Sequence, residues 1–166
     1  EAWLEEVILP KDFYWELAGF RRGRALKDWE NLGLKLRKEK LKIDKNLYST
    51  LLLPQGKKGP AFLAFQNFEV YLKWNDSFIY TVTAAHLAKR LGGAKKYKHN
   101  NPSDILDIEA MIKLQKVLRS KGYDVGKVDG ILGANTRQAV RSVQLEFGLS
   151  ADSWPTKELL RKLLIN

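Results

Sequence analysis

The sequence predicts an α+β protein in which a small antiparallel β-sheet with flanking helices is followed by a bundle of three helices. In residues 1–93, short apolar runs end at prolines and at turn residues, as strands do. In residues 105–166, apolar residues recur at helical spacing. Residues 94–104 between them are basic and polar and follow a pair of glycines, a composition typical of a linker.

Residues 61–65 and 68–74 are predicted to form the two strands of a hairpin. Both runs are rich in aliphatic and aromatic residues, and Gln66-Asn67 between them fits a tight turn. Glu69 lies on the polar, exposed side of the second run. The apolar side has a period of two, which is that of a strand, and it consists of Phe68, Val70, Leu72 and Trp74.

The period changes after residue 77, and residues 77–91 are predicted to form an amphipathic helix. Gly92 follows the last apolar position and is a suitable C-cap. The single histidine of this helix, His86, is predicted to be structural or to face solvent, since no other metal-binding or catalytic side chain accompanies it.

Three short helices are predicted in the last region. Asp107 can cap the first, which ends near Gly122. The second is expected to start near Thr136, with the hydroxyl of this residue as its cap, and to stop at Gly148. Pro155 suits the first turn of the third helix.

Composition limits the function classes. The chain contains no cysteine, and its two histidines are isolated, so we expect no metal site, no cofactor and no nucleophilic triad. No run of about 18 apolar residues occurs, so no membrane span is expected. The net charge of +10 suits an anionic partner, and both nucleic acid and the bacterial cell wall fit this requirement.

The most specific motif is the stretch from Gly122 to Thr136, which is followed by an apolar helix. With Leu114-Gln115 before it and Gly148-Leu149 after it, this pattern resembles the peptidoglycan-binding domain type 1 over residues 105–166. The two aspartates of the loop are too few for a calcium site. The exposed polar residues beside the loop that we expect to contact peptidoglycan are Asp129, Asn135 and Arg137.

Residues 1–93 resemble the end of the catalytic region of the membrane-bound lytic transglycosylase B family. The segments that carry the resemblance are residues 29–33, 51–54, 59–63, 67–68 and 74–77, together with Tyr80. The fold implied is part of a lysozyme-like catalytic region. The resemblance is most specific at the aromatic-Asn-x-Ser step of residues 74–77, which we expect to join a strand to a helix.

This step lines the glycan groove in that family, so the resemblance implies that Trp74, Asn75 and Tyr80 contact sugar. Aromatic rings stack on the apolar faces of sugars, and an Asn amide can pair with hydroxyl and N-acetyl groups. This chain has Trp74 where the family frequently has tyrosine.

The acid of these enzymes is a glutamate followed by a small polar residue, an aromatic residue and glycine. None of the glutamates of this chain has that context. We therefore assign no catalytic residue here and expect the glutamate to lie before Glu1. The sequence begins without an initiator Met or a signal segment, so we expect its natural start to have been removed.

The sequence thus predicts the C-terminal portion of a peptidoglycan lytic transglycosylase, inactive alone. Its expected partners are glycan strands, stem peptides and the missing catalytic portion, and its expected location is the periplasm or cell envelope. The alternative is a non-catalytic peptidoglycan-binding protein. Nucleic acid is the least favoured partner.

Overall fold

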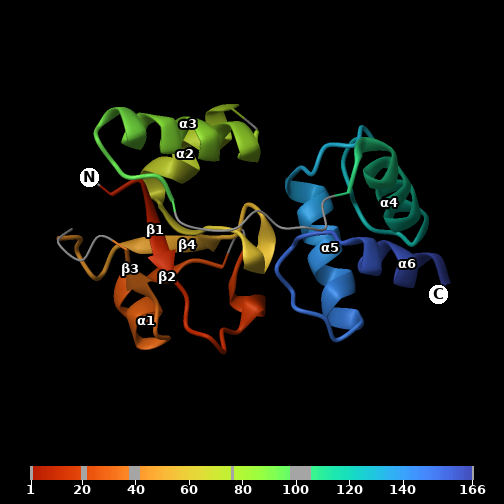
Figure 1. Ribbon diagram of the computed structural model, residues 1–166, viewed down its shortest axis with the longest axis horizontal. Helices are drawn as coiled ribbons and strands as arrows, with labels where there is room; N and C mark the ends of the chain where they lie inside the picture. Colours follow the sequence, from red (N-terminus) through yellow and green to blue (C-terminus); the bar gives the residue numbers. More distant parts are fainter. Residues whose placement is uncertain (1, 20–21, 38–41, 76, 98–105, 166) are drawn as a thin grey trace.

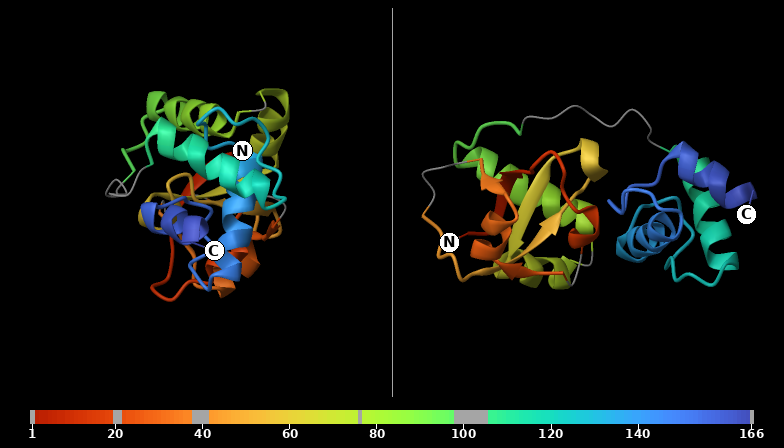
Figure 2. Two further views of the ribbon diagram at one scale, coloured as in Figure 1. Left: turned by 90° about the vertical axis from the view of Figure 1, so that its right-hand side faces the viewer. Right: turned by 90° about the horizontal axis from the view of Figure 1, so that it is seen from below.

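The computed structural model describes residues 2–19, 22–37, 42–75, 77–97 and 106–165 (Figure 1). Residues 2–97 are called the sheet region below, and residues 106–165 are called the bundle. The two lie side by side along the longest axis of the molecule (Figure 2). Residues 98–104 of the predicted linker lie outside the described residues, so its boundaries remain a prediction.

The predicted antiparallel sheet is confirmed, and it has five strands in the order β2-β4-β5-β1-β3. All four pairs of neighbouring strands are antiparallel, and Leu63 of the central strand lies opposite Leu51 and Glu5. The central strand is buried along its whole length, as its unbroken apolar sequence requires. The strands are β1 (Leu4–Ile8), β2 (Arg24–Ala25), β3 (Lys35–Leu36), β4 (Tyr48–Leu52) and β5 (Ala61–Phe65).

Each face of the sheet is covered by helices (Figure 1). On one face, α1 (Leu26–Asn31) places Trp29 in the core, where its indole N–H donates a 3.0 Å hydrogen bond to the Ser49 carbonyl. On the other face, Leu52 and Phe62 pack against α2 (Gln66–Asn75) and α3 (Phe78–Leu91). Two short 3₁₀ turns, Trp15–Leu17 and Gly56–Lys58, stand beside the sheet.

The predicted second strand of the hairpin is wrong, because residues 68–74 lie in the helix α2. Phe68 is buried and Leu72, four residues later, packs against the same core, whereas Val70 is 61% exposed. The alternating apolar residues therefore face different directions on a helix. The step at residues 74–77 consequently joins two helices, and Glu69 is on a helix, where it accepts a hydrogen bond from Thr50.

The predicted helix after residue 77 is confirmed as α3, with the Ser77 side chain accepting a hydrogen bond from the Tyr80 N–H at its start. Gly92 is its C-cap, as predicted. The following Gly93 adopts a left-handed conformation with φ of 85°, which glycine adopts at little cost.

The three predicted helices of the bundle are also confirmed. They are α4 (Ile108–Ser120), capped by Asp107, α5 (Ala134–Glu146) and α6 (Lys157–Ile165). The predicted cap at Thr136 is wrong, because α5 begins at Ala134 with Gly133 as its N-cap. Pro155 lies just before the third helix rather than in its first turn, and the Thr156 hydroxyl accepts a hydrogen bond from the Leu159 N–H.

A buried glutamine holds the loop between α4 and α5. The Gln115 carbonyl oxygen accepts hydrogen bonds from the N–H groups of Asp129 and Gly130, at 3.1 and 2.9 Å. Its amide nitrogen donates to the Ile131 carbonyl and to the Thr136 hydroxyl. Thr136 in turn donates to the Val125 carbonyl, so its hydroxyl is part of this network and unavailable as a cap. One side chain thus bonds to three backbone groups of this turn.

We expect Gln115→Leu to destabilise the bundle by roughly 2–4 kcal/mol, because the loop groups around it would lose their partners in a buried site. Urea denaturation followed by circular dichroism measures this change. The exposed Gln138 offers a matched control, since Gln138→Leu should change the free energy of unfolding by less than about 0.5 kcal/mol. Equal stability of the two variants would contradict the role given to Gln115.

Candidate functional site

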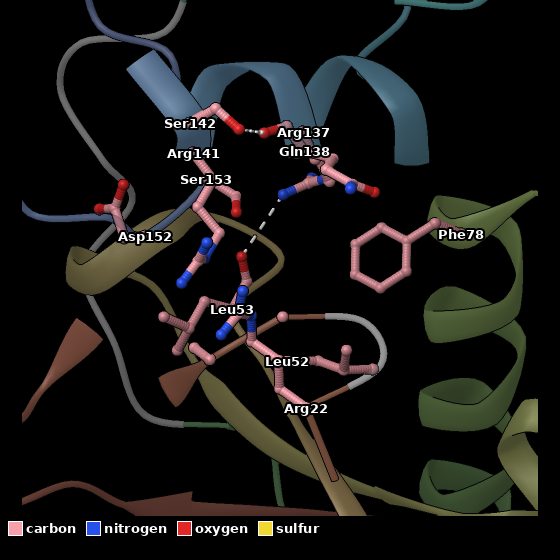
Figure 3. Close-up of a pocket in the computed structure, with 12 residues that line it drawn as sticks. Arg22, Leu52, Leu53, Phe78, Arg137, Gln138, Arg141, Ser142, Asp152 and Ser153 are labelled. Atoms are coloured by element: carbon pink, nitrogen blue, oxygen red, sulfur yellow. Dashed lines mark hydrogen bonds between the residues drawn. The ribbon is translucent and has the colours of Figure 1, made fainter. Parts of the chain in front are cut away.

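A cavity of about 430 Å³ lies between the sheet region and the bundle (Figure 3). The sheet region contributes the end of β4, the first residue of α3 and part of the loop before β2. The bundle contributes one face of α5 and the turn before α6. The lining residues are Ala18, Gly19, Arg22, Leu52, Leu53, Phe78, Arg137, Gln138, Arg141, Ser142, Asp152 and Ser153.

Arg137 crosses from α5 to the end of β4. Its guanidinium donates to the Pro54 carbonyl at 2.7 Å and, at 3.5 Å, to the Leu53 carbonyl, and Figure 3 shows it extending toward Leu53. It also lies over two aromatic rings, 4.7 Å from the centroid of Phe78 and 5.8 Å from that of Trp154. Desolvation lowers the pKa of Arg137 to about 10, and Asp152 opposes this shift. The side chain therefore remains charged at neutral pH.

A second arginine of α5, one helical turn later, also reaches the sheet region. Arg141 donates a 2.7 Å hydrogen bond to the Glu16 carbonyl in the first 3₁₀ turn. Its pKa is lowered by burial and then by the positive charge of Arg22, whereas Glu16 raises it. Arg22 is exposed, and it completes a set of three guanidinium groups around the cavity.

Asp152 is the carboxylate among the described lining residues, and its oxygens already have donors. Oδ1 accepts from Gln144 and from the Trp154 N–H, and Oδ2 accepts from the Lys57 N–H of the sheet region at 2.9 Å. Lys57 also donates to the Ser150 hydroxyl. The turn before α6 is therefore tied to the second 3₁₀ turn of the sheet region.

A glycine lets this turn come close to the bundle. Gly56 has φ of 68°, and a Cβ atom placed there would stand 2.4 Å from the Cβ of Trp154. Only glycine fits both the backbone conformation and this approach.

The residues predicted to contact glycan lie next to this cavity along the chain. Trp74 and Asn75 form the last turn of α2, and their side chains lie outside the described part of the structure. Tyr80 lies in the first turn of α3, two residues after Phe78 of the cavity wall, and it is 57% exposed. The exposed ring is free to stack on a ligand, and the assignment of the three residues to sugar stays a prediction.

The residues predicted to bind peptidoglycan from the bundle are not gathered at one site. Asp129 and Asn135 are exposed, as expected, and each also stabilises its loop. The Asp129 carboxylate accepts from the Ile131 N–H, and the Asn135 amide donates to Asp124. The expected exposure of Arg137 is wrong, because it is 4% exposed and lies against the sheet region.

A second hollow, of about 560 Å³, lies at the other end of α2. It combines the exposed ring of Tyr48, the amides of Gln66 and Asn67 and the carboxylate of Glu69. Sequence reasoning missed it because Tyr48 belongs to β4 and the others to a segment read as a hairpin.

Sequence reasoning also missed the arginine-lined cavity, although one signal was available. Arg137 precedes the buried Val140 by three residues and the buried Gln144 by seven, so it occupies the inward stripe of α5. A charged residue in such a stripe requires a buried partner. Its partners at residues 53 and 54 are more than eighty positions away, and nothing local in the sequence indicates them.

Among the described residues, no three His, Cys, Asp or Glu side chains are grouped so that they could hold a metal ion, and no helix has the length and apolarity to cross a bilayer. His86 packs against Tyr97 with ring centroids 4.9 Å apart, and burial lowers its pKa. This environment agrees with the structural role predicted for it.

Comparison with known proteins gives two family matches along the chain. The model described as "Transglycosylase SLT domain" matches residues 1–89, and the one described as "Putative peptidoglycan binding domain" matches residues 108–163. The spore cortex-lytic enzyme of Bacillus cereus is 42% identical over 57 residues, which are 32% of this chain and 22% of that protein.

Two crystal structures of SltB3 from Pseudomonas aeruginosa share this fold, with a TM-score of 0.80 and 37% identity. One is in complex with NAG-anhNAM-pentapeptide and the other with NAG-NAM-pentapeptide. The first match covers 99% of this chain and 45% of the SltB3 chain, so the chain spans less than half the length of that relative.

We expect Arg137→Ala to loosen the docking of the bundle on the sheet region. The Pro54 carbonyl would lose its guanidinium donor, the Leu53 carbonyl would keep the bond from the Gly56 N–H, and two rings would lose a stacked cation. The cost should be about 1–3 kcal/mol. Small-angle X-ray scattering should show a larger radius of gyration, with helix content unchanged by circular dichroism. Arg161→Ala, at an exposed position of α6, should leave the scattering profile unchanged. An unaltered radius in Arg137→Ala would contradict this account.

Proposed function

Because the chain belongs to the transglycosylase SLT domain family, we propose that it is the C-terminal portion of a peptidoglycan lytic transglycosylase. In this proposal it supplies one wall of the glycan cleft and an attached wall-binding bundle. The observation that carries the proposal is the match of both regions, over 99% of the chain, to SltB3, which has been solved with peptidoglycan fragments. The activity and substrate belong to the whole protein, of which this chain would be part.

The proposed reaction cleaves the MurNAc–GlcNAc bond without water and leaves a 1,6-anhydro end on the muramic acid. Its acid must stay protonated near neutral pH, which requires a carboxyl group in a partly apolar cleft. The glutamates of this chain lack the motif of the family's acid, and none lines the described cavity between the two regions. We therefore place the acid outside these 166 residues and assign binding to the residues within them.

Tyr80, Trp74 and Asn75 would hold the glycan at the corner between α2 and α3. The exposed ring of Tyr80 supplies a stacking face for a sugar. The bundle would hold the same polymer at a second place, so that even weak binding by each region gives useful retention on an insoluble wall. A protein with this substrate would act in the cell envelope, and we propose the periplasm.

We expect Tyr80→Ala to weaken binding of the chain to peptidoglycan-derived glycan by about two- to twelvefold, since one aromatic contact contributes roughly 0.5–1.5 kcal/mol. Tyr80→Phe should keep most of the affinity, because the ring face remains. Isothermal titration with a soluble glycan fragment measures the difference. Tyr14→Ala is the matched control, as Tyr14 is similarly exposed, at 65%, and outside the described cavities. Unchanged affinity in Tyr80→Ala would remove Tyr80 from the glycan contacts.

The purified chain should sediment with insoluble peptidoglycan and release no product from it. After peptidoglycan has been incubated with the chain, mass spectrometry of the soluble fraction should find no released 1,6-anhydro muropeptides. Their appearance would refute the assignment of the acid to a separate portion. Failure of the chain to sediment with peptidoglycan at low salt would refute the proposed function itself. If the chain binds but its native reading frame encodes no catalytic portion, the alternative of a non-catalytic wall-binding protein would be favoured.

A further inference from the structure

The cavity between the sheet region and the bundle carries an excess of positive charge. Arg22, Arg137 and Arg141 line it together with one carboxylate, that of Asp152. Within the described residues, none of these three arginines forms an ion pair closer than 4.0 Å. Asp152 already accepts three hydrogen bonds, so it has little capacity left for a guanidinium.

Among the described residues, the hydrogen-bond acceptors of Arg137 and Arg141 are neutral backbone carbonyls. Arg137 donates to the carbonyls of Leu53 and Pro54, and Arg141 donates to the carbonyl of Glu16. The Nε atoms of Arg137 and Arg141 are buried and have no hydrogen-bond partner. A carbonyl satisfies a donor without neutralising its charge. Three guanidinium groups with so little compensation make a favourable place for an anion.

We propose that this cavity binds a carboxylate of a peptidoglycan stem peptide. The inference rests on the proposed function and adds the site at which the peptide would be held. Guanidinium groups match carboxylates in shape and charge, and a cavity of about 430 Å³ has room for the end of a short peptide. Stem peptides are the part of this polymer that lies beside the glycan and carries free carboxylates.

The position of the cavity fits such a ligand. Phe78, in its wall, begins α3, and Tyr80 lies in the first turn of the same helix. Residues two positions apart on a helix point to different sides of it, so a stem peptide would run around this turn from a glycan on Tyr80 to the arginines. Burial is the main cause of the lowered pKa values of Arg137 and Arg141, and the positive charge of Arg22 lowers the pKa of Arg141 further.

The test compares four ligand–protein pairs. The ligands are a disaccharide-pentapeptide and the same molecule with its carboxylates converted to carboxamides. The proteins are the native chain and Arg22→Gln/Arg141→Gln, which keeps the Arg137 contacts. We expect the native chain to bind the acid about five- to fiftyfold more tightly than the amide, and the variant to bind both alike.

Three controls isolate the effect. Arg161→Gln removes an equal charge from an exposed position that does not line the cavity, and it should retain the preference for the acid. Arg22→Gln alone changes only an exposed side chain and should lose part of the preference without affecting folding. Thermal unfolding of the double variant shows whether it is folded.

The outcomes separate this inference from the proposed function. Equal affinity of the native chain for acid and amide overturns the carboxylate site and leaves the glycan assignment standing. A preference for the acid that survives in the folded double variant, or that is undiminished in folded Arg22→Gln, also overturns it. If neither ligand binds, the proposed function and this inference fail together.

Discussion

The structure depends on a buried positive charge at the junction of its two regions. The guanidinium of Arg137 leaves α5, reaches the carbonyls at the end of β4, and lies against the rings of Phe78 and Trp154. A charge in such a place is costly unless its donors are satisfied. The acceptors follow the end of β4, because the strand stops at Leu52 and the carbonyls of Leu53 and Pro54 lie outside its ladder. Arg137 can therefore make these contacts in only one placement of the bundle on the sheet region.

In the proposed function, this contact determines how the two regions would act on one ligand. A helix bundle joined only by a linker would sample many positions, and ordering it would reduce the affinity for a polymer. Here three further contacts, at Gly56, Lys57 and Glu16, hold the bundle beside the first turn of α3. The exposed ring of Tyr80 and the surface of the bundle are consequently held at a fixed distance from each other. The binding energy of one region is then available to the other without a large entropic loss.

Local signals in the sequence predicted the bundle well and the sheet region only in part. Asp107, Gly122 and Gly148 end or cap helices through their own backbone chemistry, so their effect can be read from the sequence. Residues 68–74 were predicted to be a strand because their apolar residues alternate. Such alternation is also compatible with a helix when one apolar side chain is exposed, as Val70 is. The cavity could not be predicted, since it is formed by residues from distant segments that meet only through packing. Arg137 was predicted to be an exposed residue of the bundle, and its burial could not be foreseen because it depends on the sheet region.

The arginine at position 137 indicates that the junction does more than hold the two regions together. A well-packed apolar side chain would hold two regions together with no desolvation cost, and replacement of buried charges by such residues often stabilises a protein. An arginine at 137, followed by another at 141 and faced by a third at 22, concentrates like charges, and the charge of Arg22 lowers the pKa of Arg141. This arrangement reduces stability where the two regions meet. Binding of an anion would relieve that repulsion and strengthen the junction at the same time, so ligand binding and docking of the bundle would each favour the other.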